Sequence, residues 1–223
     1  MRTTDVMAQL EKAGSAATRK TYARHGVAGP MFGTSFAVLG KLAKTIKLDQ
    51  PLADKLWSTG NHEARILATM IADPETISRK QLDGWAKVAD NYGLAGAIGR
   101  VVAKTPDARA TAEAWTKSDG EYIGQCGWTV LAVLAGGGDR VSETDCMTLL
   151  ARIEKTIASA PNRVRHTMNS TLIAIGGRSP KLRTAALAAH KRIGKVEVDH
   201  GDTACVTPNA DAYIAKIWAR KKA

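Results

Sequence analysis

Residues 51–73 read PLADKLWSTGNHEARILATMIAD and predict two amphipathic helices joined by one tight turn. Pro51 opens the first helix, and its apolar residues keep a spacing of three or four until Gly60 ends it. Asn61 then caps a second helix over His62–Asp73. The apolar side of this second helix contains Ala64, Ile66, Leu67, Met70 and Ile71. Because each helix can bury its apolar face only against neighbours, the stretch is typical of a repeat built from helical pairs.

The same pattern recurs along the chain. A short helix carries Met7 and Leu10, and further helices are predicted at 15–25, 34–46, 78–88, 91–104, 107–117, 121–135, 142–157, 161–175, 180–193 and from about 209 to the basic end. Ser78 and Ser142 begin capping boxes, and Thr34 is expected to cap the helix that follows it. Gly136-Gly137-Gly138 is expected to end the helix before it.

Taken two at a time, the eleven or twelve expected helices repeat roughly every 30–40 residues, which is the period of stacked helical pairs. The alternation that marks a strand occurs only at Val196–Val198. We therefore expect an all-α solenoid of degenerate helical repeats that forms a single domain over residues 1–223. A compact all-α domain without repeats is the alternative.

Positive charge is concentrated in one block of the chain. The whole chain carries +11, from 32 Lys and Arg against 21 Asp and Glu. Residues 152–195 hold ten basic residues and one acid, so the block is +9 and the other 179 residues sum to +2. A basic block within amphipathic helices indicates a shaped surface for a polyanion, most commonly nucleic acid. The predicted DNA-binding residues are Arg65, Arg152, Lys155, Arg163, Arg165, Arg178, Lys181, Arg183, Lys191 and Arg192, and Lys195 completes the block.

Several other classes of protein are not expected. No apolar run approaches the ~20 residues that a membrane-spanning helix needs. The N-terminus lacks the apolar segment of a signal peptide, and the three cysteines show no CxxC spacing, which favours a reduced, cytoplasmic chain. The run from His62 to Ile66 begins like a helical zinc motif, but Ile66 stands where the second histidine must be. We expect a monomer without metal or cofactor, with Glu63 and Arg65 at the surface or in a groove.

A cluster of small and aromatic residues follows the predicted helix over 78–88. Gly93, Gly96 and Gly99 recur every third residue and are expected to let a neighbouring helix approach closely, or to leave room for a bound chain or nucleic acid. Tyr92 begins this segment, either packed or exposed for stacking on a sugar or base. The tryptophans expected in the core are Trp57, Trp85 and Trp115.

A family resemblance rests on several stretches together. They are Phe32–Ser35 with Leu39–Lys44, Leu56–Arg65 with Ala72–Pro74, Trp115–Ile123, Arg165–Asn169 with Ile175–Gly176, and Ile193–Thr203. From about Phe32 to Ile214 the chain resembles the bacterial DNA alkylation-repair family of HEAT-like repeats, the alkylpurine DNA glycosylases. The resemblance implies a C-shaped α-solenoid whose basic concave groove holds duplex DNA. Active members release N3- or N7-alkylated purines, and two tryptophans and an aspartate contact the sugar of the damaged nucleotide.

The chain departs from this pattern at the residues that the resemblance implies for catalysis. Gly96 stands where the catalytic aspartate belongs, and an aromatic residue persists at Tyr92. Ser170 replaces the second tryptophan, and Gly124-Gln125 replaces an expected arginine. A glycine cannot stabilise positive charge on a sugar, and losing a group that acts in the transition state lowers rate more than binding.

Three hypotheses follow from these observations. The first is a DNA-binding member of the family, engaging duplex or structured DNA, with weak or no excision of alkylated purines. The second is an active glycosylase that uses Tyr92 with Asp90 or Asn91. The third is a helical-repeat scaffold that binds proteins. Salt separates the first from the third, because DNA binding weakens steeply as counterions are released.

Overall fold

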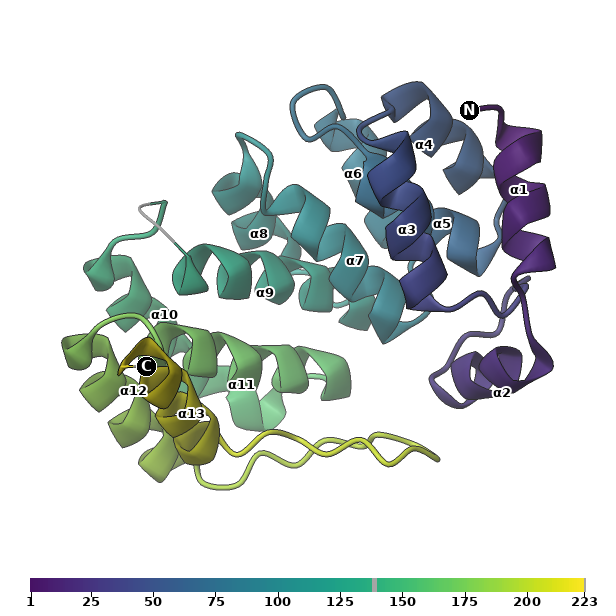
Figure 1. Cartoon of the computed structure of the whole chain (residues 1–223). Coiled ribbons are helices and arrows are strands. Elements are labelled where there is room, and N and C mark those ends of the chain that lie inside the picture. Colours follow the sequence, from purple (N-terminus) through teal and green to yellow (C-terminus); the bar gives the residue numbers. More distant parts are fainter. Residues whose placement is uncertain (138–139, 223) are drawn as a thin grey trace. The chain divides into compact units, whose positions relative to one another are not determined.

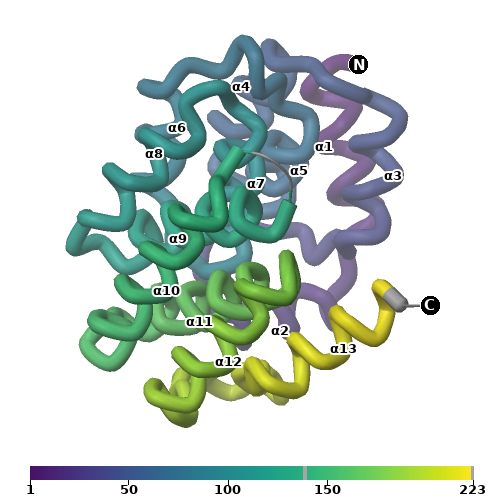
Figure 2. Tube along the Cα trace, turned by 90° about the vertical axis from the view of Figure 1, so that its left-hand side faces the viewer, coloured from purple at the N-terminus to yellow at the C-terminus, as the bar shows by residue number. Residues whose placement is uncertain are grey.

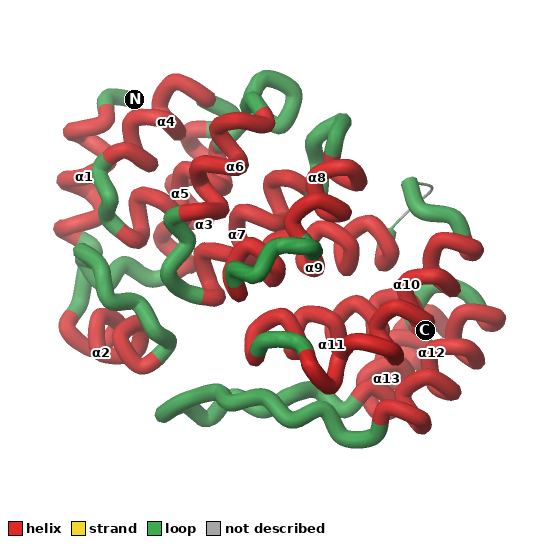
Figure 3. The backbone as a smooth tube through the Cα atoms, turned by 180° about the vertical axis from the view of Figure 1, so that it is seen from behind, coloured by secondary structure: helices red, strands yellow, loops and turns green. Residues whose placement is uncertain are grey.

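The computed structural model describes residues 1–137 and 140–222, and these residues form thirteen α-helices and one short 3-10 helix (Figure 1). Figure 3 shows helices and loops but no strand in this described part of the chain. The all-α prediction is therefore confirmed. The strand hint at Val196–Val198 is wrong, because these residues are extended but pair with no second strand. Gly138, in the predicted helix stop, lies outside the described residues.

The chain divides into two compact units. The first contains Met1–Ala108 with Gly201–Thr203, and the second contains Arg109–His200 with the residues from Ala204 onward. The single domain over residues 1–223, the C-shape and the concave groove stay predictions.

The first unit is organised around the second helix of the 51–73 pair. Its helices are α1 (Thr3–Lys12), α2 (Ala16–Arg24), α3 (Phe36–Ile46), α4 (Gln50–Ser58), α5 (His62–Ile71), α6 (Arg79–Lys87) and α7 (Tyr92–Val102). Helix α5 packs against α1, α3, α4 and α7, and α6 packs against α7. Asn61 caps α5 as predicted, since its Oδ1 accepts a hydrogen bond of 3.0 Å from the Ala64 N–H. Helix α4 begins one residue before Pro51, with Asp49 as its cap.

The second unit is organised around α11. Its helices are α8 (Ala108–Trp115), which begins at the last residue of the first unit, α9 (Glu121–Gly136), α10 (Glu143–Thr156), the 3-10 helix (Ile157–Ser159), α11 (Asn162–Gly176), α12 (Pro180–Ile193) and α13 (Ala210–Lys222). Helix α11 packs against α9, α10, α12 and α13, and α10 packs against α12 (Figure 2). In both units the second helix of one pair packs on the second helix of the next, as stacked repeats require.

Two details of the sequence prediction, the cap of α3 and the burial of Trp57, are corrected by the structure. Thr34 is fully buried and does not cap α3; Ser35 precedes that helix, and the Thr34 hydroxyl donates a hydrogen bond of 2.5 Å to the Leu10 carbonyl. Phe36, at the start of α3, is 48% exposed. Trp85 and Trp115 are buried as predicted, whereas Trp57 is only half-buried because it stacks on Trp85 near the surface.

Two glycines of α9 lie in close contact with neighbouring segments of the second unit. A Cβ on Gly127 of α9 would lie 2.8 Å from the backbone nitrogen of Thr116, next to α8. A Cβ on Gly124 would lie 2.9 Å from a methyl carbon of Val164 in α11. At Gly96, by contrast, the nearest atoms belong to the guanidinium of Arg100 in the same helix, at 3.5–4.0 Å. The expected close approach of a neighbouring helix at Gly96 is therefore wrong.

This contrast predicts opposite effects of the same substitution. Gly96→Ala should stabilise the fold by about 0.5–1 kcal/mol, because a Cβ fits there and alanine is the better helix former. Gly127→Ala should destabilise it by about 1–3 kcal/mol, because backbone atoms of the next helix must shift. Urea unfolding of the two variants beside the parent chain measures both changes. Equal changes of one sign would contradict this account of the two helices.

Candidate nucleic-acid interface

Glu63 is buried in the first unit and holds the loop between α2 and α3. Its Oε1 accepts hydrogen bonds from the N–H groups of Gly33 at 2.5 Å and Thr34 at 3.0 Å, and its Oε2 accepts one from Phe32 at 3.1 Å. The side chain is fully buried, so the prediction of a surface or groove residue is wrong. Three backbone donors replace the water that a buried carboxylate loses.

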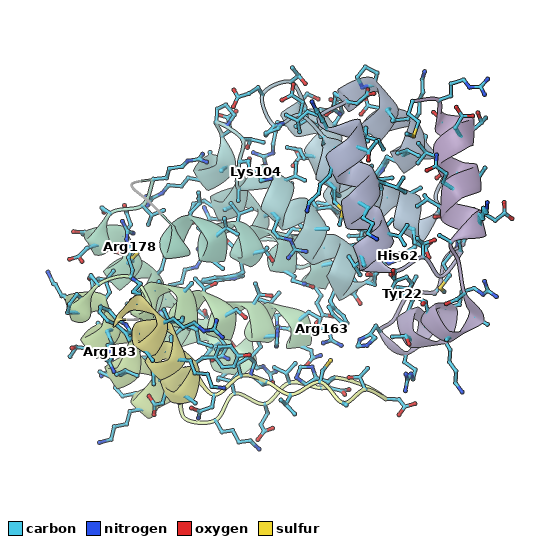
Figure 4. The ribbon with its side chains drawn as sticks, in the orientation of Figure 1. Tyr22, His62, Lys104, Arg163, Arg178 and Arg183 are labelled. Carbon is cyan, nitrogen blue, oxygen red and sulfur yellow. The ribbon has the colours of Figure 1, made fainter. Side chains whose placement is uncertain are left out.

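Residues around Glu63 tie the same loop to three helices. Tyr22 of α2 donates a hydrogen bond of 2.6 Å to the Thr34 carbonyl, and its ring meets the His62 ring edge-on (Figure 4). Burial, together with the nearby Glu63 charge, raises the pKa of Tyr22 to about 12, so the phenol stays protonated. Burial lowers the pKa of His62, while the Glu63 carboxylate acts in the opposite direction. This cluster therefore has a structural role.

The three candidate catalytic residues lie together at the start of α7, and each takes part in a hydrogen bond within the first unit. The Tyr92 hydroxyl is hydrogen-bonded to Nδ1 of His25, the residue that follows α2. Asn91 caps α7 through its Oδ1, which accepts a bond of 3.0 Å from the Leu94 N–H. Its Nδ2 donates a bond of 2.8 Å to Asp90, whose side chain is exposed. These contacts leave Asp90 as the accessible carboxylate, six residues before Gly96.

The position of Gly96 is covered by a cation. Arg100 lies one helical turn further along α7, and its guanidinium nitrogens would be 3.5 and 3.8 Å from a Cβ at Gly96. Ser170, at the predicted second tryptophan position, donates a hydrogen bond of 3.1 Å to the His166 carbonyl of its own helix.

Arg65 lies in an aromatic stack on the first unit. The rings of Trp57 and Trp85 are parallel within 9° and 4.2 Å apart, and the Arg65 guanidinium lies 5.3 Å from the centre of the Trp57 ring. The Arg65 Nε is buried and has no hydrogen-bond partner within the described residues. The residue is half-buried, so it presents only part of its charge to solvent.

Three arginines of the predicted block are used inside the second unit. Arg152 forms an ion pair with Glu113 at 3.1 Å, donates to the Thr116 hydroxyl at 2.7 Å and lies over the Trp128 ring. Arg165 donates to the backbone carbonyls of Glu197 and Ala160 at 2.8 and 3.1 Å. Arg192 forms a bidentate pair with Glu154 at 2.5 and 2.9 Å.

The remaining cations of the block spread along the second unit. Lys155, Lys181 and Lys191 are exposed, and Lys195 is exposed but paired with Glu197. Arg183 lies over the Trp218 ring, and Arg178 donates to the Cys146 sulfur. Arg163 lies in the first turn of α11, which is about 22 Å long, and Arg178 lies two residues beyond the other end of this helix (Figure 4). The block is thus an extended surface rather than one cluster.

A second basic segment, which was not predicted, lies in the first unit. Residues 12–48 contain no acid, and each of their seven cations is exposed: Lys12, Arg19, Lys20, Arg24, Lys41, Lys44 and Lys47. These residues belong to α1, α2, α3 and their flanks in the first unit. Charge summed over short windows along the sequence predicts this segment. The sum over all residues outside 152–195 does not show it, because acidic residues elsewhere cancel its charge.

Two further observations concern other ligands. Within residues 1–137 and 140–222, no group of three or more His, Cys, Asp or Glu side chains is arranged to hold a metal ion. In that same range, every helix is too short or too polar to cross a membrane.

The helical pairs place the chain in the class of all-α repeat proteins, and its sequence identifies the family. The profile of the DNA alkylation repair enzyme family matches residues 6–196, and the chain belongs to that family. The family expected from the resemblance is therefore confirmed, while the substitutions at its catalytic positions stay predictions.

The chain is also similar to individual proteins over nearly its whole length. Uncharacterized protein Lmo0209 of Listeria monocytogenes is 29% identical over 212 residues, which is 92% of each chain. Uncharacterized protein Lin0241 of Listeria innocua is 27% identical over 210 residues, 91% of each. A solved structure aligns at a TM-score of 0.90 and 30% identity, covering 99% of this chain and 95% of its own. It is described as a new family of proteins related to the HEAT-like repeat DNA glycosylases with affinity for branched DNA structures.

Glu63→Gln tests whether the buried carboxylate holds the first unit together. The amide removes the charge and turns an NH2 group toward backbone donors, so the free energy of unfolding should fall by about 3 kcal/mol. Urea unfolding of the full chain measures the loss. Glu75→Gln, at an exposed residue of the same unit, is the matched control and should change stability by less than about 0.5 kcal/mol. Similar stability of both variants would disprove the structural role.

Proposed function

We propose that this protein binds DNA, with a preference for branched or otherwise non-linear DNA, and excises alkylated purines weakly or not at all. The observation that carries the proposal is that each unit has its own exposed basic segment. Residues 12–48 supply it in the first unit and residues 152–195 in the second. Lysine and arginine side chains of this kind contact phosphates and carry no direct sequence preference.

Two basic segments suit a DNA molecule with more than one duplex arm. Each segment can contact the backbone of an arm, and the shape of the DNA then decides whether both segments bind at once. The structurally similar protein described above, with affinity for branched DNA structures, supports this preference.

Weak excision follows from the surroundings of Gly96. The resemblance places a catalytic aspartate there, whose charge would stabilise a cationic sugar. In this chain the nearest side-chain atoms to that position belong to the Arg100 guanidinium, which opposes positive charge developing on the sugar. The Tyr92 hydroxyl and the Asn91 amide are already hydrogen-bonded, so the alternative of an active glycosylase using them would require those bonds to break.

Charge reversal in either basic segment should weaken DNA binding. Lys181→Glu with Lys191→Glu, and separately Lys20→Glu with Lys44→Glu, should each reduce affinity for a four-way junction. Each double variant should also lower the slope of log affinity against log salt, by about 1 for each phosphate that the variant no longer neutralises. Fluorescence anisotropy over a series of salt concentrations measures both quantities.

The matched control reverses two exposed lysines outside both segments, Lys55 and Lys87, with the same change in net charge. Its junction affinity should fall far less than that of the other two double variants. If all three variants lose affinity equally, only net charge matters and the proposed surfaces are wrong.

Base release should stay at the spontaneous rate. Single-turnover incubation with a duplex that contains one 7-methylguanine follows binding and release together, with an active family member as the positive control. We expect binding without accelerated release, since a missing transition-state interaction lowers rate more than affinity. Release at a rate near that of the positive control would establish an active glycosylase instead.

A further inference from the structure

The second unit contains a cavity of about 360 Å³ at the end of the basic block, whose last member, Lys195, is one of the lining residues. It is lined by the C-terminal part of α12, by one residue of α11 and by the parts of the loop over 195–200 and 205–209. This loop runs out from α12 and returns to α13 (Figures 1 and 3). The polar lining includes His190, Lys195 and the carboxylate residue Glu197, together with Asn169, His200, Thr207 and Asn209, and Val196, Val198 and Val206 supply an apolar wall.

Helix α11 fixes the wall of this cavity. Asn162 exchanges two hydrogen bonds of 2.7 Å with the backbone of Asp199, and Arg165 donates to the Glu197 carbonyl at 2.8 Å. Asn169 donates to the Pro208 carbonyl at 2.9 Å, on the returning part of the loop. The loop is therefore bonded to one rigid helix at several points, and the cavity is already formed before any ligand binds.

Two groups in the cavity point to its ligand. His190 lines the cavity, and its Nδ1 atom, which is enclosed by the protein, has no hydrogen-bond partner within the described residues. Lys195 is exposed, and its ammonium group lies 2.7 Å from the Glu197 carboxylate, so a bound anion would compete with Glu197 for it. The valines of the wall can contact a flat, apolar face of a ligand whose polar groups meet His190 and Lys195.

We propose that this cavity binds one unpaired nucleotide, with the base against the valines and His190 and the phosphate on Lys195. The volume lies within the range of about 300–1,000 Å³ that small-molecule ligands occupy, which is far more than inorganic phosphate fills. The inference deepens the proposed function, because branch points and DNA ends expose nucleotides that have no pairing partner.

The test titrates the full chain with the four deoxynucleoside monophosphates, the matching nucleosides and inorganic phosphate, followed by NMR chemical shifts. Saturable binding of nucleotides, with weaker binding of nucleosides and least of phosphate, is expected. Phosphate binding as tightly as the nucleotides, or no saturable binding of any nucleotide, would overturn the proposal.

Three variants assign the contacts. His190→Ala should weaken nucleotides and nucleosides alike, by about three- to tenfold. Lys195→Ala should weaken only nucleotides, and Glu197→Gln should strengthen only nucleotides, because it removes the competing carboxylate. Both of the latter residues are highly exposed, at 84% and 70% of the side chain, so their variants test the site even if His190→Ala fails to fold. Lys117→Ala, at an exposed lysine of the second unit outside the basic block, is the control and should change nothing. Unchanged nucleotide binding in both Lys195→Ala and Glu197→Gln would reject the site.

A fully paired four-way junction separates this inference from the proposed function. If the junction binds but nucleotides do not, only the nucleotide cavity is refuted. If nucleotides bind but neither the junction nor duplex DNA does, the cavity stands and the proposed DNA-binding function falls.

Discussion

The buried carboxylate of Glu63 is the interaction on which the first unit depends. It accepts three N–H groups of the loop between α2 and α3 from the first turn of α5, and that loop is also bonded to residues of α1 and α2. Gly33 completes the arrangement: its φ is +81°, and a Cβ there would overlap the Ser15 carbonyl oxygen. One carboxylate therefore holds four helices in place, among them the three that, with their flanks, carry the exposed cations of residues 12–48.

The basic residues divide by chemical type. Arg152, Arg165 and Arg192 use their planar guanidinium groups for several simultaneous bonds that hold helices and loops together. The lysines, which are compact and strongly hydrated, are the block members most exposed to solvent. Formal charge consequently overstates how many cations of residues 152–195 are available to a polyanion.

Helix positions could be predicted from the sequence because caps and apolar spacing are local signals. The bounds of α12 match the prediction at both ends, and both capping boxes are present. Burial of Glu63 could not be predicted, because its partners lie about thirty residues away in an irregular loop. The guanidinium of Arg100 near Gly96, by contrast, belongs to an i, i+4 neighbour on one helix face, which is a local relation that the sequence does contain. The basic character of the candidate nucleic-acid interface could be predicted from the sequence, but only some of its exposed residues could. The reason is that the exposure of each arginine depends on whether it has an ion-pair or hydrogen-bond partner within the protein.

The small buried surface of helix α2 affects how readily this helix opens, in addition to the charge that it carries. Among its nine residues only Tyr22 is buried, so the helix is held by a few side-chain bonds rather than by an apolar face. An element with so little buried surface opens locally at low free-energy cost, well below that of global unfolding. This helix carries the exposed side chains of Arg19, Lys20 and Arg24. Phosphates that engage these three side chains would lower the opening frequency of α2, so ligand occupancy would be visible as slowed amide hydrogen exchange in this helix.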